Sequence, residues 1–276
     1  MYNKTDVKQL VSILKMNQDC LKDYCFNELS KYYKSNNIDN DNGFIFCRGE
    51  IPIMLVAHLD TVGDNPPDKI LYDKDYIISI NSILGGDDRC GVFTIIKLLE
   101  KGYKPYVLFA EDEEFGGVGT SKFLKKYQEK LDLKYIIELD RRGEDDCVFY
   151  DTGNEKFISY IESFGFKKAF GSFSDISLIS PQYDIASANL SVGYYKEHTL
   201  HEYIDMKNMY KTYRRVCKML NNIRRCKYFD MQEINYTKIA NEIMPIDNDI
   251  YIKEDNLQYQ EYYEDMYQEY LDYLNR

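Results

Sequence analysis

Apolar and polar positions along the first third of the chain follow first a helical period and then a strand period. Apolar residues recur at helical spacing after Thr5-Asp6, which we expect to cap a helix, and again from Cys20 to Tyr32. A polar, asparagine-rich break at 36–43 follows. The strand 44–47 and the continuous apolar run 51–57 come next, and this run predicts a buried central strand. Residues 70–80 predict an edge hairpin that turns at 73–75.

From residue 87 onward, helical and strand patterns alternate. We expect helices over residues 90–101, 118–130, 155–163 and 206–223, and a short helix after Ser174-Asp175. Strands are expected between them, at 106–110, 135–139 and 186–191. Such alternation is typical of a parallel sheet whose connecting helices cover it. The sequence therefore predicts a three-layer α/β fold, with a mixed, largely parallel central sheet and helices on both faces.

The C-terminal segment has a different composition. We predict a single catalytic domain over residues 1–228 and an acidic, tyrosine-rich, helical extension over 229–276. Residues 245–276 contain nine acids and two bases, and aromatic and methionine side chains recur there at three- and four-residue steps: Tyr259, Tyr263, Met266, Tyr270 and Tyr273. One interpretation is a helix that docks on the domain. The other is a segment for self-association or for a protein partner.

Composition and charge exclude several classes of protein. The net charge of −11 argues against a nucleic-acid partner, which needs clustered Lys and Arg. No apolar stretch approaches the roughly 18–20 residues of a membrane-spanning helix, so we expect no membrane association. The N-terminal residues lack the layout of a secretion signal, and the seven cysteines form no C-x-x-C pair. These features predict a cytoplasmic protein with free thiols.

All three histidines lie beside carboxylates, which indicates a metal site. His58 ends the apolar strand and precedes Asp60 by two residues, so both side chains can face the same side. The carboxylate of Asp60 can then fix the imidazole tautomer. His198 and His201 lie in the segment Glu197-His-Thr-Leu-His-Glu202. The alternative is a structural turn in which Asp60 caps backbone amides.

Acidic residues lie at the ends of three further elements. Asp87 and Asp88 precede the helix at 90–101, Glu113 and Glu114 follow the strand at 106–110, and Asp140 follows the strand at 135–139. Helix capping or a solvated loop would explain each group by itself. Together, however, we expect them to meet at one edge of the sheet, where open α/β sheets place their sites.

The kinds of ligand indicate the metal. Imidazole and carboxylate without thiolate favour catalytic zinc, or a similar divalent ion such as cobalt or manganese, over structural zinc. Three ligand carboxylates and one bridging hydroxide balance the charge of two divalent cations. A single cation would leave excess negative charge in a partly dry pocket.

At this point the sequence resembles the co-catalytic zinc exopeptidase superfamily, which includes aminopeptidases, tripeptidases, glutamate carboxypeptidases and related deacylases. The matching segments keep the order of that superfamily: His58-Leu-Asp-Thr-Val, Gly86-Asp-Asp-Arg-Cys-Gly, Asp112-Glu-Glu-Phe-Gly, Asp140 and His198-Thr-Leu-His-Glu. The resemblance implies that His58 binds one metal and that Asp87 bridges two. It also implies that Glu114 is a ligand, that Asp140 completes the shell of one ion and that His198 completes the shell of the other.

The same resemblance implies the catalytic roles. Glu113 would be the general base, and Asp60 would orient His58. His201 falls at a position that is usually not a ligand and would contact substrate at most. Asp175 lies where the superfamily often has a Ser/Thr-Asp pair near the site, although a helix N-cap at Ser174 or Asp175 explains it equally well.

Two short spacings distinguish this chain from the larger members of the superfamily. Only 58 residues separate Asp140 from His198, and 29 separate His58 from Asp87, which leaves no room for an inserted lid or dimerisation domain. We therefore expect a minimal, single-domain version, closest to the lidless aminopeptidases. Because lids often shape the substrate pocket, the specificity stays open.

The expected function is metal-dependent hydrolysis of an amide bond, by an aminopeptidase-like exopeptidase that acts on short peptides. A deacylase or amidase acting on N-acyl amino acids or other non-peptide amides would use the same ions and base. A non-catalytic binding protein that engages a partner through its C-terminal helix is the alternative from a different class.

Overall fold

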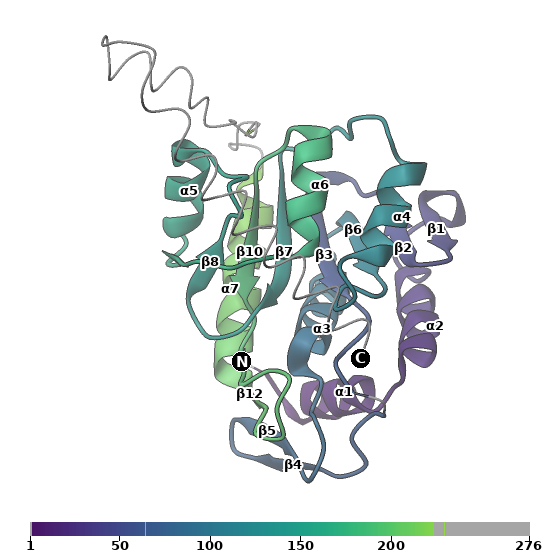
Figure 1. Cartoon of the computed structure of the whole chain (residues 1–276), viewed down its shortest axis with the longest axis vertical. Helices are drawn as coiled ribbons and strands as arrows, with labels where there is room; N and C mark the ends of the chain where they lie inside the picture. Colours follow the sequence, from purple (N-terminus) through teal and green to yellow (C-terminus); the bar gives the residue numbers. More distant parts are fainter. Residues whose placement is uncertain (1, 64, 224–228, 230–276) are drawn as a thin grey trace, which may run out of the picture. The chain divides into compact units, whose positions relative to one another are not determined.

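A central sheet of eight strands forms the middle layer of the molecule (Figure 1). The computed structural model describes residues 2–63, 65–223 and 229, which belong to one compact unit, Met1–Glu233. The strands lie in the order β1 (Ile38–Asp41), β2 (Phe44–Cys47), β6 (Pro105–Ala110), β3 (Ile51–His58), β7 (Tyr135–Arg141), β10 (Ser187–Ser191), β8 (Asp146–Val148) and β9 (Lys167–Lys168). The four strands from β6 to β10 are parallel, and antiparallel pairings flank them at β2 and β8. The predicted mixed, largely parallel sheet is confirmed.

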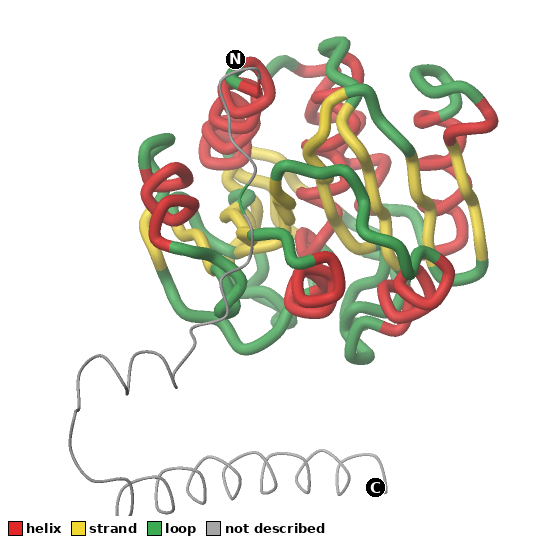
Figure 2. Tube along the Cα trace, turned by 90° about the horizontal axis from the view of Figure 1, so that it is seen from above, coloured by secondary structure: helices red, strands yellow, loops and turns green. Residues whose placement is uncertain are grey.

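Helices cover both faces of this sheet, as Figure 2 shows. One hydrophobic core takes side chains from α1 (Lys4–Leu14), α2 (Gln18–Leu29), α3 (Gly86–Glu100), α5 (Glu155–Glu162) and α7 (Met206–Asn221). The other takes them from α4 (Val118–Lys126) and α6 (Asp175–Tyr183). The three-layer prediction is therefore correct.

Strand β3 connects the two cores because its side chains alternate between them. Leu55 and Ala57 belong to the first core, whereas Met54 and Val56 belong to the second, and all four are fully buried. Burial of each larger apolar side chain contributes roughly 1.5–3 kcal/mol. A strand buried on both faces explains the continuous apolar run and holds His58, its last residue, at the middle of the sheet.

Two local expectations near the N-terminus are wrong. Helix α1 is capped by Asn3, not by Thr5-Asp6: the Asn3 side chain accepts the backbone N–H of Thr5 and Asp6, and the Asp6 side chain accepts the N–H of Asn3. The polar segment 36–43 is not merely a break. It begins within a 3-10 turn, Ser35–Asn37, and contains the edge strand β1. The pairing of β1 with β2 orders this segment, although it has few apolar side chains.

A second, four-stranded antiparallel sheet has the order β11 (Tyr194–Tyr195), β12 (Tyr203–Asp205), β5 (Tyr76–Ser79) and β4 (Ile70–Asp73). The hairpin expected at 70–80 forms its β4 and β5 strands, with β4 at the edge. The sheet buries Ile77, Ile204 and Tyr194 against the body of the molecule. Two segments next to this sheet belong to the candidate site: residues 80–85, which follow β5, and residues 196–202, which connect β11 with β12.

Beyond α7, Phe229 packs against Tyr135, Phe157 and Tyr160, with ring centroids 5.2–6.2 Å apart. Apart from Phe229, the acidic, tyrosine-rich extension and its expected helix lie outside the described residues, so the boundary at residue 228 stays a prediction. Among the helices described, none has the length and apolar character that crossing a membrane requires.

Candidate active site

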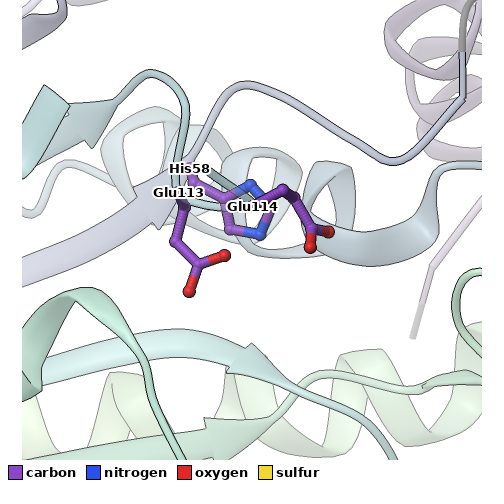
Figure 3. Close-up of side chains that lie close together, drawn as sticks. All are labelled: His58, Glu113 and Glu114. Atoms are coloured by element: carbon purple, nitrogen blue, oxygen red, sulfur yellow. The ribbon is translucent and has the colours of Figure 1, made fainter. Parts of the chain in front are cut away.

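Three parallel strands bring the predicted ligands to one edge of the sheet. His58 ends β3, which lies between β6 and β7, and parallel strands present their carboxyl ends at the same edge. Glu113 and Glu114 lie in the loop after β6, and Asp140 lies near the end of β7. In Figure 3 the imidazole of His58 appears between the side chains of Glu113 and Glu114.

Asp87 reaches the same place from the start of a helix. It lies in the first turn of α3, eight residues after β5 ends, and the peptide bond between Asp87 and Asp88 is cis. The buried carboxylate of Glu202 holds this turn, because it accepts the backbone N–H of Leu84 (3.0 Å), Gly85 (2.8 Å) and Asp87 (3.2 Å). A helix start held by a buried acid, not a strand end, therefore positions Asp87.

The predicted ligands form two groups that share Asp87. In the first, His58 Nε2 lies 3.1 Å from Asp87 Oδ1 and 3.4 Å from Asp140 Oδ1. In the second, His198 Nε2 lies 3.2 Å from Asp87 Oδ2 and 2.8 Å from Glu114 Oε1. In each group the three ligand atoms lie within 4.8 Å of one another. The two oxygens of one carboxylate thus face two different sets of nitrogen and oxygen donors.

Asp60 connects His58 with the loop that carries the two glutamates. Its carboxylate lies 3.1 Å from His58 Nδ1 and accepts the backbone N–H of Glu113 and Glu114, both at 3.0 Å. The contact on Nδ1 leaves Nε2 of His58 facing Asp87 and Asp140. Both arrangements that the sequence allowed for Asp60 therefore occur together: it contacts the imidazole and it accepts backbone amides.

The acidic run 111–114 divides into two pairs: the first two residues contact side chains and backbone away from the ligands, and the last two face the ligand cluster. Glu111 is buried away from the ligands, where it pairs with Lys22 Nζ at 2.6 Å and accepts the N–H of Gly43. Asp112 accepts the side-chain amide of Gln18 and has a positive φ of 58°. Glu113 and Glu114 face the ligand cluster. The left-handed backbone conformation of Asp112 lies at the point where the chain turns from the first pair to the second.

His198 lies in the connection between β11 and β12 and is the most exposed of the ligand candidates, with 42% of its side chain accessible. Its φ of 60° is unusual for a residue other than glycine. His201, three residues later, is exposed and belongs to neither ligand group. It lines a cavity of about 380 Å³ together with Leu200 and Tyr203.

The concentration of buried acids perturbs the ionisation of the whole cluster. Burial raises the pKa of Glu113 to about 9, with the carboxylates of Asp140 and Asp175 adding to the effect. Burial and the neighbouring Asp87 raise the pKa of Asp140 to about 7. Hydrogen bonds to Asp87 and Glu114 raise the pKa of His198 to about 10. These groups hold protons that a cation at the same place would displace.

His58 and Asp60 behave as an ion pair in the absence of a cation. Burial disfavours the charged imidazole, but the carboxylates of Asp140 and Asp60 outweigh it and hold the pKa of His58 well above its usual value. Burial also opposes ionisation of Asp60, and His58 with the two backbone amides overcomes this and lowers the pKa of Asp60.

Sequence reasoning missed a buried polar layer beneath Asp140. Asn189 on β10 donates to the backbone oxygen of Asp140 (3.1 Å) and accepts its N–H (3.0 Å), and it also donates to Ser174. Glu138 accepts the hydroxyl of Ser174, and burial raises its pKa well above normal. Tyr194 donates to the backbone oxygen of Asp140. Two polar residues inside predicted apolar strands, Glu138 and Asn189, are the sequence signals for this layer.

Asp175 is fully buried at the start of α6, and burial raises its pKa to about 6. Ser174 occupies the N-cap position, but its hydroxyl donates to Glu138 and makes no capping hydrogen bond. Ser174 is therefore the N-cap residue that the sequence allowed, although its side chain caps no backbone amide. A contact of Asp175 or His201 with substrate stays a prediction.

The donor sets fit two divalent cations. Each set offers one imidazole nitrogen and carboxylate oxygens without thiolate, the chemistry that suits catalytic zinc and related ions. His58, Asp87 and Asp140 would hold one ion, and Asp87, Glu114 and His198 would hold the other. Glu113 belongs to neither of these sets, although it groups with His58 and Glu114 in a third cluster. Its carboxyl group therefore lies beside one member of each of these two sets.

The fold is similar to that of solved aminopeptidase and tripeptidase structures. An aminopeptidase PepT from Bacillus cereus matches with a TM-score of 0.63 at 15% identity, over 79% of this chain and 98% of that one. A tripeptidase from Staphylococcus aureus matches with a TM-score of 0.64 at 14% identity, over 82% of this chain and 100% of that one. An aminopeptidase from the archaeon Desulfurococcus kamchatkensis matches with a TM-score of 0.62 at 12% identity, over 78% and 94%.

No protein-family model matches the chain, and no curated protein matches its sequence. The structural matches confirm the resemblance that the five sequence segments indicated, at the level of the fold. At these identities the activity and the roles of single residues stay proposals.

Proposed function

We propose that the protein is a hydrolase that uses two divalent metal ions, most simply zinc, to cleave the terminal amide bond of a short peptide. The observation that carries this proposal is the pair of ligand groups that share Asp87, with Glu113 beside them. The peptidase fold supports it, and the solved structures named above are described as aminopeptidases and a tripeptidase.

When bound, the ions would polarise the scissile carbonyl and make a water molecule acidic enough to ionise near neutral pH. Asp87, the carboxylate common to both ligand groups, would help to hold both ions. Asp60 would orient the His58 ring by its contact with Nδ1 and would also fix the backbone of the glutamate loop. The geometry of the site and the position of the base would then depend on one carboxylate.

Glu113 would move the proton. Its carboxylate takes a proton from the attacking water and delivers it to the leaving amine, so it acts first as base and then as acid. Its raised pKa suits both steps, because a buried carboxyl group binds and releases protons closer to neutral pH than an exposed one. Cations among the neighbouring acids would lower this pKa and leave the group ionised at the start of the reaction.

The first test replaces the proposed base. We expect Glu113→Gln to reduce turnover by about 10²–10⁴-fold, because the amide cannot accept the proton. Its metal content, measured by elemental analysis, should equal that of the unmodified protein. Glu129→Gln, at an exposed carboxylate, is the matched control and should keep full activity. A Glu113→Gln protein with most of its activity would refute the assignment.

The substrate panel for this test contains aminoacyl anilides, dipeptides, tripeptides and N-acyl amino acids, each with added zinc, cobalt or manganese. Cleavage of the peptides or anilides supports the proposal. Cleavage of the N-acyl amino acids alone would make the protein a deacylase with the same ions and base. A metal-loaded protein that is inactive on every substrate would favour a binding function.

The second test counts ions. We expect two bound ions in the unmodified protein, a loss of about one in Asp140→Asn or His198→Ala, and the loss of nearly both in Asp87→Ala, because only Asp87 belongs to both groups. Elemental analysis after gel filtration gives the stoichiometry. Equal losses in all three variants would show that Asp87 does not bridge two sites.

A further inference from the structure

The hairpin formed by β4 and β5 carries an unusual share of exposed apolar surface. Among the described residues, nine large hydrophobic side chains are exposed, and four of them lie on this hairpin: Leu71 (43%), Tyr72 (45%), Tyr76 (49%) and Ile78 (41%). The hairpin belongs to the second sheet, in which β4 is the edge strand. An exposed edge with apolar side chains is a template for pairing with another strand.

Some of these side chains continue a single row across the sheet. Residues directly opposite each other on antiparallel strands point to the same face, and the strand registers place four such residues side by side: Tyr195, Tyr203, Ile78 and Leu71. The rings of Tyr195 and Tyr203 are stacked, with centroids 4.9 Å apart. The row ends at Leu71, on the free edge.

The backbone of β4 fixes which groups are free at that edge. The backbone oxygen of Lys69 accepts the N–H of Ile80. Every second residue of an antiparallel strand directs its backbone groups to the same neighbour, so those of Leu71 and Asp73 also point toward β5. The N–H and C=O groups of Ile70 and Tyr72 therefore point away from β5. An antiparallel partner strand must use these two residues.

The sequence around β4 is complementary to itself in charge when it is read in the antiparallel direction. In the run Asp68-Lys-Ile-Leu-Tyr-Asp-Lys74, a two-fold axis at Leu71 places Lys69 opposite Asp73 of the other copy, and Asp68 opposite Lys74. Each opposition occurs twice. Neither Lys69 nor Asp73 has an ion-pair partner within the part of the chain that the structure describes.

Other two-fold registers allow the backbone hydrogen bonds between the two β4 strands but do not place opposite charges next to each other. An axis at Ile70 places Lys69 opposite Leu71 and leaves both charges without partners. An axis at Tyr72 places Lys69 opposite Asp75, whose carboxylate already pairs with Lys207 at 2.8 Å and accepts the hydroxyl of Tyr2. Of these three registers, only the axis at Leu71 both pairs the backbone groups of Ile70 and Tyr72 and places Lys69 opposite Asp73.

We propose that two copies of this chain associate through β4, in antiparallel register about Leu71, and so join their four-stranded sheets into one sheet of eight strands. Ile70 and Tyr72 of each copy exchange backbone hydrogen bonds with Tyr72 and Ile70 of the other. The apolar row then continues across the two-fold axis through the two Leu71 side chains. Because the same patch serves both copies, the assembly closes as a dimer and does not extend into a fibre.

This proposal is independent of the proposed hydrolase activity, since none of the edge residues belongs to the ligand groups. Sedimentation velocity of the full chain over about 1–100 μM should show a dimer that dissociates on dilution. Lys69→Asp and Asp73→Lys each place like charges opposite each other at two symmetric positions. We expect either change to weaken the dimer by about tenfold or more.

The double variant Lys69→Asp with Asp73→Lys restores both oppositions with the signs exchanged, and its dissociation constant should return to within about threefold of the original. Lys125→Asp, the same charge change on the exposed surface of α4, is the matched control and should leave the dimer unchanged. Circular dichroism of each variant checks that the hairpin remains folded.

Two results would overturn the proposal. A full chain that sediments as a monomer throughout the concentration range has no such interface. A dimer that is insensitive to both single charge changes associates through another surface, of which residues 245–276 are the first candidate, and truncation before residue 245 would then abolish it.

Discussion

At the scale of single residues, the candidate site depends most on side chains that support the ligands. Asp60 contacts the His58 ring and accepts two backbone amides of the glutamate loop. Glu202 accepts three amides of the turn that carries Asp87. Each of these carboxylates is buried and pre-organises two segments at once. The position of the ligands is thus fixed by charge-assisted hydrogen bonds to the backbone.

We expect Asp60→Asn to impair both roles of Asp60, the contact with His58 and the support of the glutamate loop. The amide keeps the size of the carboxylate but presents only one acceptor oxygen, so one of the two loop N–H groups loses its partner, and the negative charge beside His58 is lost. Changes of this kind typically cost 10–100-fold in metal affinity or activity. Isothermal titration calorimetry with metal measures the loss of metal affinity.

Asp112→Asn is the control for this substitution, because Asp112 is part of the same acidic run but contacts Gln18, away from the ligands. It should change metal affinity by less than about threefold. Equal effects of the two substitutions would mean that general negative charge, not the contact with His58, matters.

At the scale of elements, the junction of α3 with β7 decides where Asp87 lies. Gly91 packs so closely against the sheet that a Cβ atom there would lie 2.1 Å from the backbone oxygen of Leu139 and 2.4 Å from Asp88 Oδ2. Only glycine permits this approach. The first turn of α3 and the end of β7 are thereby held together, and Asp87 and Asp140 with them.

Gly91→Ala should therefore displace α3 from β7. We expect the free energy of unfolding to fall by about 1–3 kcal/mol, as for other overpacked positions, and metal binding to weaken in the folded fraction. Urea unfolding and metal titration measure the two effects. Ser159→Ala, on the exposed side of α5, should change neither. A stable Gly91→Ala protein with unchanged affinity would show that this junction tolerates movement.

The sequence predicted elements well wherever one segment carried its own signal. The apolar run of β3, the helical spacing of α7 and the hairpin of β4 and β5 lie within a few residues of their expected bounds. The short strands β8, β9, β11 and β12 were not expected, because two or three residues take strand form only when a distant strand pairs with them. For the same reason β1 was assigned to a polar break.

The site shows the same division between local and distant information. His58, Asp60 and the glutamate pair were found because each follows an apolar strand in the sequence. The layer of Glu138, Ser174 and Asn189 was not, because it depends on the register of β7 with β10, which places Asn189 opposite Glu138. Which side chains meet across strands is decided by pairing that no single segment records.

At the scale of the whole molecule, the buried acids make metal binding and folding interdependent. The structure collects Asp87, Glu113, Asp140, Asp175 and Glu202 at or beside one edge of the sheet, and repulsion among such groups opposes folding unless protons or cations neutralise them. Because the ligands must be deprotonated to bind metal, protons and cations compete for the same atoms.

The sign of the pH dependence follows from these groups. Burial raises the pKa of Asp140 and of Glu202 to about 7 and that of Asp175 to about 6, all above their unfolded values. Their contribution to stability is complete below about pH 4 and is lost as the pH rises through about 6–7. The lowered pKa of Asp60 acts in the opposite direction, but only below its unfolded value of about 4.

Metal-free protein should therefore lose thermal stability as the pH rises from about 5 to about 8, and the stabilisation by added zinc should increase over the same range. Thermal unfolding with a chelator and with zinc, at each pH, measures both trends. Asp87→Ala should show little increase with zinc, since it removes the carboxylate common to both ligand groups. A zinc stabilisation that is independent of pH, or as large in Asp87→Ala as in the unmodified protein, would place the bound metal elsewhere on the molecule.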